Sequence, residues 1–101
     1  MFNNLLGNLG KAQEKMKEIK DRLETIEVTG EVENVKVIAN GNKVIKNIII
    51  NDAMMSASQK EELEELLVVA INRSLKNAEN VYDAEMKSMA KELMPSMPGM
   101  F

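Results

Sequence analysis

The first segment of the chain carries an apolar pattern that is typical of a helix packed against a second helix. From Leu5 onward, apolar positions recur at intervals of 4, 3, 4, 3, 4 and 3 residues, which is the spacing of the seam in a coiled coil. We therefore expect a helix that begins at about residue 3 or 8 and ends at about residue 26. Gly7 and Gly10 weaken its first turns and favour an ordered start near Lys11. The seam consists of Leu5, Leu9, Ala12, Met16, Ile19, Leu23 and Ile26.

The next segment has β character and predicts three short strands. We expect them at residues 27–30, 32–39 and 43–51, with a tight turn at residues 40–42 between the last two. In the second strand, alternation places Val35, Val37 and Ala39 on one face. The sequence therefore predicts an antiparallel sheet of three strands.

Both faces of this predicted sheet are partly apolar. In the third strand, Ile48 and Ile50 share one face, and Ile45 and Ile49 lie opposite. A small sheet with two apolar faces needs cover on both. We expect a helix on one face and a second subunit near the other.

A second, longer helix is predicted for residues 59–93, a length of roughly 50 Å at the usual helical rise. Three strands cannot cover a helix of that length, so its C-terminal half either projects or packs on the seam of the first helix. Asn77 and Asn80 mark a place, between about residues 77 and 83, at which the helix can break. The acidic residues at 61–65 fall in its first turns, where they favour the helix dipole.

The predicted elements form a single α+β domain over residues 1–94. The last residues, 95–101, contain Pro95 and Pro98, and we expect them to be a disordered tail. Aromatic residues are scarce, with one Tyr, two Phe and no Trp, so the core depends on aliphatic side chains. Burial against a second copy of the chain is therefore attractive.

Cysteine and histidine are both absent from the 101 residues. Their absence excludes disulfides and removes the commonest metal ligands and the commonest general acid/base. The glycines match no phosphate-binding loop, and the nine methionines show no clustered repeats typical of a copper site. We expect a protein that is not an enzyme and uses no cofactor, metal or small-molecule substrate.

The chain has no apolar run near the roughly 20 residues that a membrane span requires. Asn and Gly interrupt residues 2–9, so the start lacks a secretory pattern. These features predict a soluble cytoplasmic protein.

The formal net charge of −3 does not favour a nucleic-acid partner, but the charges are segregated along the chain. Residues 11–22 carry five basic and three acidic side chains, whereas residues 60–65 carry four Glu and one Lys. Spacing alone favours a solvated face that supports a partner helix over a face that binds phosphates. The residues themselves leave the function open.

Several segments, taken in their order and spacing, carry a resemblance to a known family. They are MFNNLLGNL (1–9), KAQEKM (11–16), VTG (28–30), VKV (35–37), NG (40–41), III (48–50), LEELLVVAIN (63–72) and PGM (98–100). In these segments nearly the whole chain resembles the YbaB/EbfC nucleoid-associated DNA-binding proteins.

The resemblance implies a homodimer shaped like tweezers, in which the sheets join at the centre and helical arms project on each side. Family members bind DNA through the first helix and the C-terminal helical region, and they coat the chromosome or influence gene expression. Spacing alone favours a solvated face that supports a partner helix, but the resemblance favours a DNA-binding face instead. It predicts contacts with double-stranded DNA at the nucleoid. Carried onto this chain, the DNA-binding candidates are Lys11, Lys15, Lys17, Lys20, Arg22, Lys87 and Lys91.

Two segments differ from the family's pattern. The acidic segment Glu31-Val32-Glu33-Asn34 follows Gly30, where many relatives carry a glycine-rich loop, and NRSL (72–75) replaces a run similar to Asn-Asp-Ala-Leu. We expect the first difference to affect DNA preference and the second to adjust packing.

Two functions are consistent with these residues and with the resemblance. The first is binding of double-stranded DNA, mainly through phosphates, with little direct reading of bases because the chain shows no evident recognition helix. The alternative is a dimeric protein-interaction module that serves a replication or recombination factor. Both include a homodimer.

Overall fold

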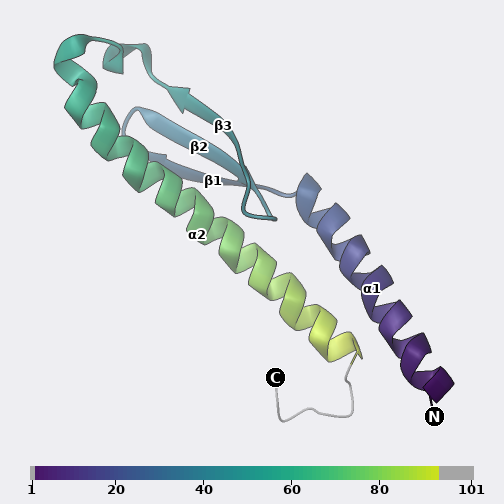
Figure 1. The fold of residues 1–101 in the computed structure, drawn as a ribbon. Coiled ribbons are helices and arrows are strands. Elements are labelled where there is room, and N and C mark those ends of the chain that lie inside the picture. Colours follow the sequence, from purple (N-terminus) through teal and green to yellow (C-terminus); the bar gives the residue numbers. More distant parts are fainter. Residues whose placement is uncertain (1, 94–101) are drawn as a thin grey trace.

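The computed structural model describes residues 2–93 and has the predicted α+β order (Figure 1). Helix α1 (Phe2–Thr25) precedes strands β1 (Glu27–Val32), β2 (Val35–Asn40) and β3 (Ile45–Ile50). Two short 3-10 turns, Asp52–Met54 and Ala57–Gln59, lead into helix α2 (Lys60–Leu93). The predicted tail, residues 95–101, lies outside the described residues.

Several boundaries differ from those predicted, including the starts of β2 and β3, which are at Val35 and Ile45 rather than at residues 32 and 43. Helix α1 begins at Phe2, in agreement with the expected start at about residue 3, and not near Lys11, where the glycines favoured an ordered start. Helix α2 continues through residues 77–83 without a break, because the side chain of Asn77 bonds to strand β1 rather than to its own helix. Strand β1 extends to Val32, and the turn falls at residues 33–34, where Asn34 adopts a positive φ of 66° that Asn tolerates well.

The sheet is antiparallel with the order β1-β2-β3, and α2 covers one of its faces. Val35 and Val37 are buried beneath Ala70 of α2, as the alternation predicts. The prediction for Ile45 was wrong, because Ile38 pairs with Asn47 while Ala39 pairs with Ile45. The extra residue between them is a β-bulge that turns Ile45 to the core face.

Helix α2 approaches strand β1 most closely at Gly30. A Cβ atom at this position would lie 2.2 Å from the carbonyl oxygen of Ala70 and 2.3 Å from the backbone nitrogen of Ser74. No side chain other than hydrogen fits there. Two α2 side chains flank this contact, and Arg73 and Asn77 donate hydrogen bonds of 2.8 and 2.7 Å to the carbonyls of Glu31 and Thr29 on β1.

The β2–β3 turn holds the C-terminal end of α1. The backbone N–H of Gly41 donates to the carbonyls of Leu23 and Ile26 at 2.9 and 3.0 Å, which satisfies the end of the helix. Lys43 in the same turn places its Nζ 4.1 Å from the ring centre of Tyr82 on α2, a cation–π contact. The turn therefore joins both helices at one point.

From that joint, α1 and the C-terminal half of α2 extend side by side towards the same end of the molecule, as two antiparallel arms (Figure 1). The seam of α1 is buried near the joint at Ile19 and Leu23, whereas Leu9 towards the tip is 54% exposed. Two ion pairs link the arms: Lys15 with Glu92, at 2.9 Å, and Arg22 with Glu85. The predicted packing of the seam on the C-terminal half of α2 is confirmed at the base of the arms.

The resulting molecule is strongly elongated, with extents of 68 × 25 × 16 Å. Its radius of gyration is 19.3 Å, against about 13 Å for a compact domain of this length. A single chain in this shape leaves much of its apolar surface outside a core. The shape therefore favours association with a further surface.

We expect Gly30→Ala to lower the free energy of unfolding by about 1–3 kcal/mol, because the added methyl group forces α2 away from β1. Urea denaturation at fixed protein concentration measures the change. Gly10→Ala is the matched control: a Cβ there meets nothing within 4 Å, and the helix should gain about 0.5–1 kcal/mol. Equal stability of the Gly30→Ala variant and the wild type would contradict the close contact.

We expect Lys15→Glu to separate the arms, because it places a carboxylate against Glu92. The chain has no cysteine, so spin labels on Gln13→Cys and Ser88→Cys, both exposed sites, report the distance between arms by pulsed electron resonance. Labelled chains are diluted with unlabelled protein. The distance distribution should broaden in Lys15→Glu and narrow again when Glu92→Lys is added.

Lys17→Glu serves as the control for this experiment, since Lys17 has no ion pair among the described residues. Superimposable distance distributions for the wild type and Lys15→Glu would show that the ion pair does not position the arms.

Candidate nucleic-acid interface

The basic residues of α1 fall into two groups. Lys11, Lys17 and Lys20 are exposed and form no ion pair within residues 9–92. Lys15 and Arg22 instead lie on the flank that faces α2 and bind Glu92 and Glu85. The structure therefore does not bring the five α1 candidates together on one surface.

The Lys15 ammonium is tied closely to its partner. Its hydrogen bond with the Glu92 carboxylate raises the pKa of Lys15 above the ordinary value of lysine. Glu18, at 3.8 Å, is a weaker second partner on the same helix. Lys15 thus stays charged at neutral pH and is already neutralised by an acidic side chain of the same protein.

Sequence spacing could not reveal these partners. Glu18 is a natural helical partner for Arg22, but the structure pairs Arg22 with Glu85, 63 residues away. Seven residues separate Lys15 from Arg22, and seven separate Glu85 from Glu92. The two ion pairs therefore repeat at the heptad interval of the seam. This interval relates one ion pair to the other, but it does not identify which residues are partners.

On α2, the two acidic residues that pair with α1 and the lysines near the C-terminal end lie on different sides of the helix. Glu85 and Glu92 turn towards α1, while Lys87 and Lys91 are exposed. Arg73 and Lys91 are 18 residues apart, which is five helical turns, so they lie on the same side of α2. The sequence shows similar numbers of basic and acidic residues on this helix, and the structure turns two of the acidic ones, Glu85 and Glu92, towards α1.

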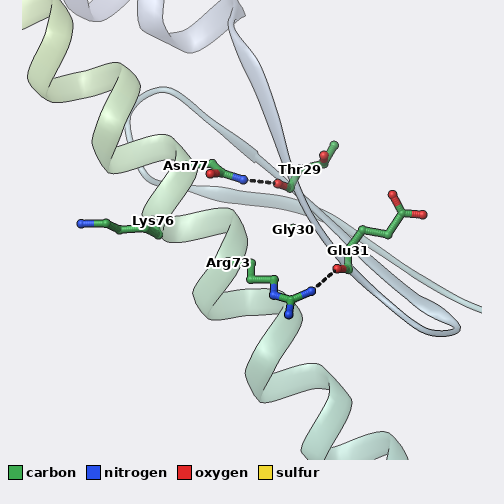
Figure 2. A pocket seen from close by; sticks show the side chains of 6 residues that line it. All are labelled: Thr29, Gly30, Glu31, Arg73, Lys76 and Asn77. Carbon is green, nitrogen blue, oxygen red and sulfur yellow. Dashed lines mark hydrogen bonds between the residues drawn. The ribbon is translucent and has the colours of Figure 1, made fainter.

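Arg73 and Lys76, which are not among the candidates predicted from the sequence, line a pocket of about 390 Å³ between α2 and strand β1. Figure 2 shows the guanidinium of Arg73 and the amide of Asn77 pointing to the strand, and Lys76 pointing away from it. Thr29, Gly30 and Glu31 form the opposite wall. The signal for Arg73 in the sequence is its place in NRSL (72–75), which differs from the family's pattern.

The acidic residues at the start of α2 lie at the opposite end of the molecule from the arms (Figure 1). Glu61, Glu62, Glu64 and Glu65 are exposed there, and Glu64 pairs with Lys60 at 3.6 Å. The arms, residues 2–25 and 77–93, carry seven basic and eight acidic side chains. Their net charge is therefore close to zero, and a polyanion would be attracted by particular exposed lysines rather than by a uniformly basic end of the molecule.

Among residues 2–93 no three acidic, His or Cys side chains are grouped so as to hold a metal ion. Neither helix in this range has a stretch apolar and long enough to cross a bilayer.

Comparison with known proteins gives one consistent result. A sequence profile of the YbaB/EbfC DNA-binding family matches residues 1–93. A nucleoid-associated protein of Flavobacterium johnsoniae is 33% identical over 98 residues, covering 95% of this chain and 91% of the relative. Nucleoid-associated proteins of Thermoanaerobacter sp. (strain X514) and Clostridium kluyveri are 35% and 36% identical, each covering 99% of this chain and 90% and 88% of the relatives.

The fold has a counterpart among solved structures. The crystal structure of an uncharacterized protein from Helicobacter pylori superimposes with a TM-score of 0.68 at 19% identity, and covers 80% of this chain and 96% of that one. At this level of sequence identity, the comparison shows that the two proteins share a fold. The family profile and the relatives, which cover nearly the full length, show that the chain belongs to the YbaB/EbfC DNA-binding family.

Proposed function

We propose that the protein is a homodimeric nucleoid-associated protein that binds double-stranded DNA mainly through phosphate contacts. The observation that carries this proposal is a set of exposed lysines on both arms that form no ion pair among the described residues. The acidic residues Glu85 and Glu92 are paired between the arms, whereas Lys17, Lys20 and Lys87 face solvent.

Phosphate contacts fit the residue types on these surfaces. The exposed cations are lysines on helices, which act as point charges rather than as readers of base edges. Binding would then gain most of its free energy from the release of counterions. The relatives' names, nucleoid-associated proteins, support chromosomal DNA as the partner, with a role in organising the chromosome or regulating genes.

Within the set of seven candidates we assign two roles. Lys11, Lys17 and Lys20 on α1, with Lys87 and Lys91 on α2, contact phosphates. Lys15 and Arg22 contribute by holding α1 against α2, because their charges are already paired with Glu92 and Glu85.

The homodimer is supported by an uncovered edge and an apolar surface beside it. Helix α2 covers β1 and β2, and in Figure 1 nothing within residues 2–93 lies along the outer edge of β3. Ile48 on β3 is 40% exposed and Val68 on α2 is 60% exposed. An unpaired strand beside exposed aliphatic side chains is a natural site for pairing with a second copy.

The alternative function, a protein-interaction module for a replication or recombination factor, is favoured by one observation. Leu9 belongs to the seam of α1 but is 54% exposed, so the tips of the arms offer apolar surface to a partner helix. A result without DNA binding would make this the leading proposal.

We expect the wild-type protein to bind a labelled duplex of about 30 base pairs in fluorescence anisotropy. With six or more phosphate contacts per dimer, the affinity should fall by about 10³ or more between 50 and 200 mM salt. Lys20→Gln should weaken binding about threefold or more, and each phosphate contact that it removes should lower the slope of log affinity against log salt by about one.

Lys60→Gln is the matched control for Lys20→Gln. It removes the same charge from an exposed lysine, but at the acidic end of α2. An equal loss of affinity in both variants would show that net charge, and not the arms, determines binding. Absence of binding by the wild type at low salt would refute the DNA proposal.

We expect Ile48→Lys combined with Val68→Asp to shift the protein from dimer to monomer, because both substitutions place charges on the apolar surface beside β3. Light scattering after size-exclusion chromatography measures the mass. Lys17→Gln, a substitution at an exposed site on α1 away from β3, is the control and should remain dimeric. A wild-type mass of one chain at micromolar concentration would exclude the homodimer.

A further inference from the structure

The pocket between strand β1 and helix α2 has a feature that the DNA-binding candidates on the arms lack: a cation fixed in position by the backbone. Arg73 donates a hydrogen bond from one terminal nitrogen to the carbonyl of Glu31 at 2.8 Å. That bond orients the planar guanidinium. A charged group that is held in place before its partner arrives loses less entropy on binding.

The remaining donors of this guanidinium are unused. Arginine has five N–H groups, and among the described residues Arg73 makes one side-chain hydrogen bond and no ion pair with a carboxylate within 4.0 Å. Arg22 of α1, in contrast, is neutralised by Glu85. Arg73 therefore retains its full charge and most of its donors at the surface.

The pocket is lined by two cationic side chains, Arg73 and Lys76, and by one acidic residue, Glu31. Lys76 adds a second positive charge one turn along α2, and its partner Glu79 is 3.8 Å away with both side chains largely exposed. An exposed pair of this kind is strongly screened. Glu31 contributes its backbone carbonyl to the pocket, whereas its carboxylate points away from Arg73 (Figure 2). The reason is that Glu31, which lies opposite Lys36 in the register of β1 and β2, has its side chain on the sheet face away from α2.

The pocket continues the basic flank of the arm. Arg73 and Lys91 lie on one side of α2 over about 27 Å, and Lys87 lies between them, 11 residues beyond Lys76. Asp83 is the acidic residue at the margin of this flank, while Glu85 and Glu92 face α1. A DNA strand that follows α2 from the arm tip would reach the pocket after about eight nucleotide steps.

We infer that the pocket is a phosphate site for the DNA backbone, with Arg73 and Lys76 as its cationic ligands. The inference rests on the proposed binding of DNA and extends it from the arms to the junction of helix and sheet. A phosphodiester presents two unesterified oxygens, which match the fork of Arg73. The Lys76 side chain points away from β1 in Figure 2 and turns towards the bound phosphate to supply a mobile second charge. Asn77 stays on the carbonyl of Thr29 and keeps the wall of the pocket in place.

If Arg73 only stabilises the fold, its substitution would weaken DNA binding without any phosphate contact being lost. Arg73 and Asn77 cover carbonyls at the outer edge of β1, so loss of Arg73 alone could act through the fold. Lys76 covers no backbone group and pairs only with Glu79 among the described residues. Lys76 is therefore the residue whose substitution separates phosphate binding from protection of the strand edge.

The test measures duplex binding over a series of salt concentrations for the wild type, Lys76→Gln, Arg73→Lys and the control Lys60→Gln. We expect Lys76→Gln to bind about threefold or more weakly near physiological salt, with a salt slope lower by about one for each subunit that contacts DNA. Arg73→Lys keeps the charge but loses the fork, so its affinity should fall while its slope changes little. Thermal unfolding of each variant checks that the fold is retained.

The outcomes separate this inference from the proposed function. Wild-type binding with an unchanged affinity and slope in Lys76→Gln would overturn the phosphate site and leave DNA binding by the arms intact. No salt-sensitive binding by the wild type would overturn both. A loss of the same size in Lys60→Gln would also overturn the site, since it would assign the effect to net charge.

Discussion

The close contact between α2 and β1 at Gly30 determines how the other parts of the molecule are placed. Because the strand has no side chain at this point, the helix backbone lies directly on it, with Ala70 and Ser74 in contact. This fixes the depth and direction of α2 across the sheet. A helix of 34 residues that starts beyond one end of the sheet must then project past the other end, and that projection forms one of the two arms.

The second constraint is electrostatic and acts at the arms themselves. The two ion pairs between α1 and α2 use two cations and two anions, so they leave the net charge unchanged. They do change where charge remains: Glu85 and Glu92 of the α2 arm are paired with α1, and Lys87 and Lys91 stay exposed. A chain with a net negative charge can in this way leave individual lysines available to a polyanion.

The sequence predicts the fold well where the pattern is local. The heptad seam, the alternation around Val35 and the long second helix all depend on residues within a few positions of each other. The face of Ile45 was predicted wrongly because a bulge shifts the register by one residue, and alternation contains no signal for it. The partners of Lys15 and Arg22 depend on contacts between distant elements, so spacing within α1 could only suggest local partners. Arg73 was missed for the same reason, since its importance comes from the strand it reaches.

The two edges of the sheet are treated differently, and this asymmetry connects assembly with binding. The outer carbonyls of β1 at Thr29 and Glu31 are occupied by Asn77 and Arg73, so that edge is poorly suited to pair with another strand. Strand β3 has no such cover within the described residues and carries the exposed Ile48. If a second copy pairs at β3, the pocket at β1 remains on the outside of the dimer, on the same flank of α2 as Lys91. In such a dimer, the side chains that prevent pairing at β1 would keep that edge available for the proposed phosphate site.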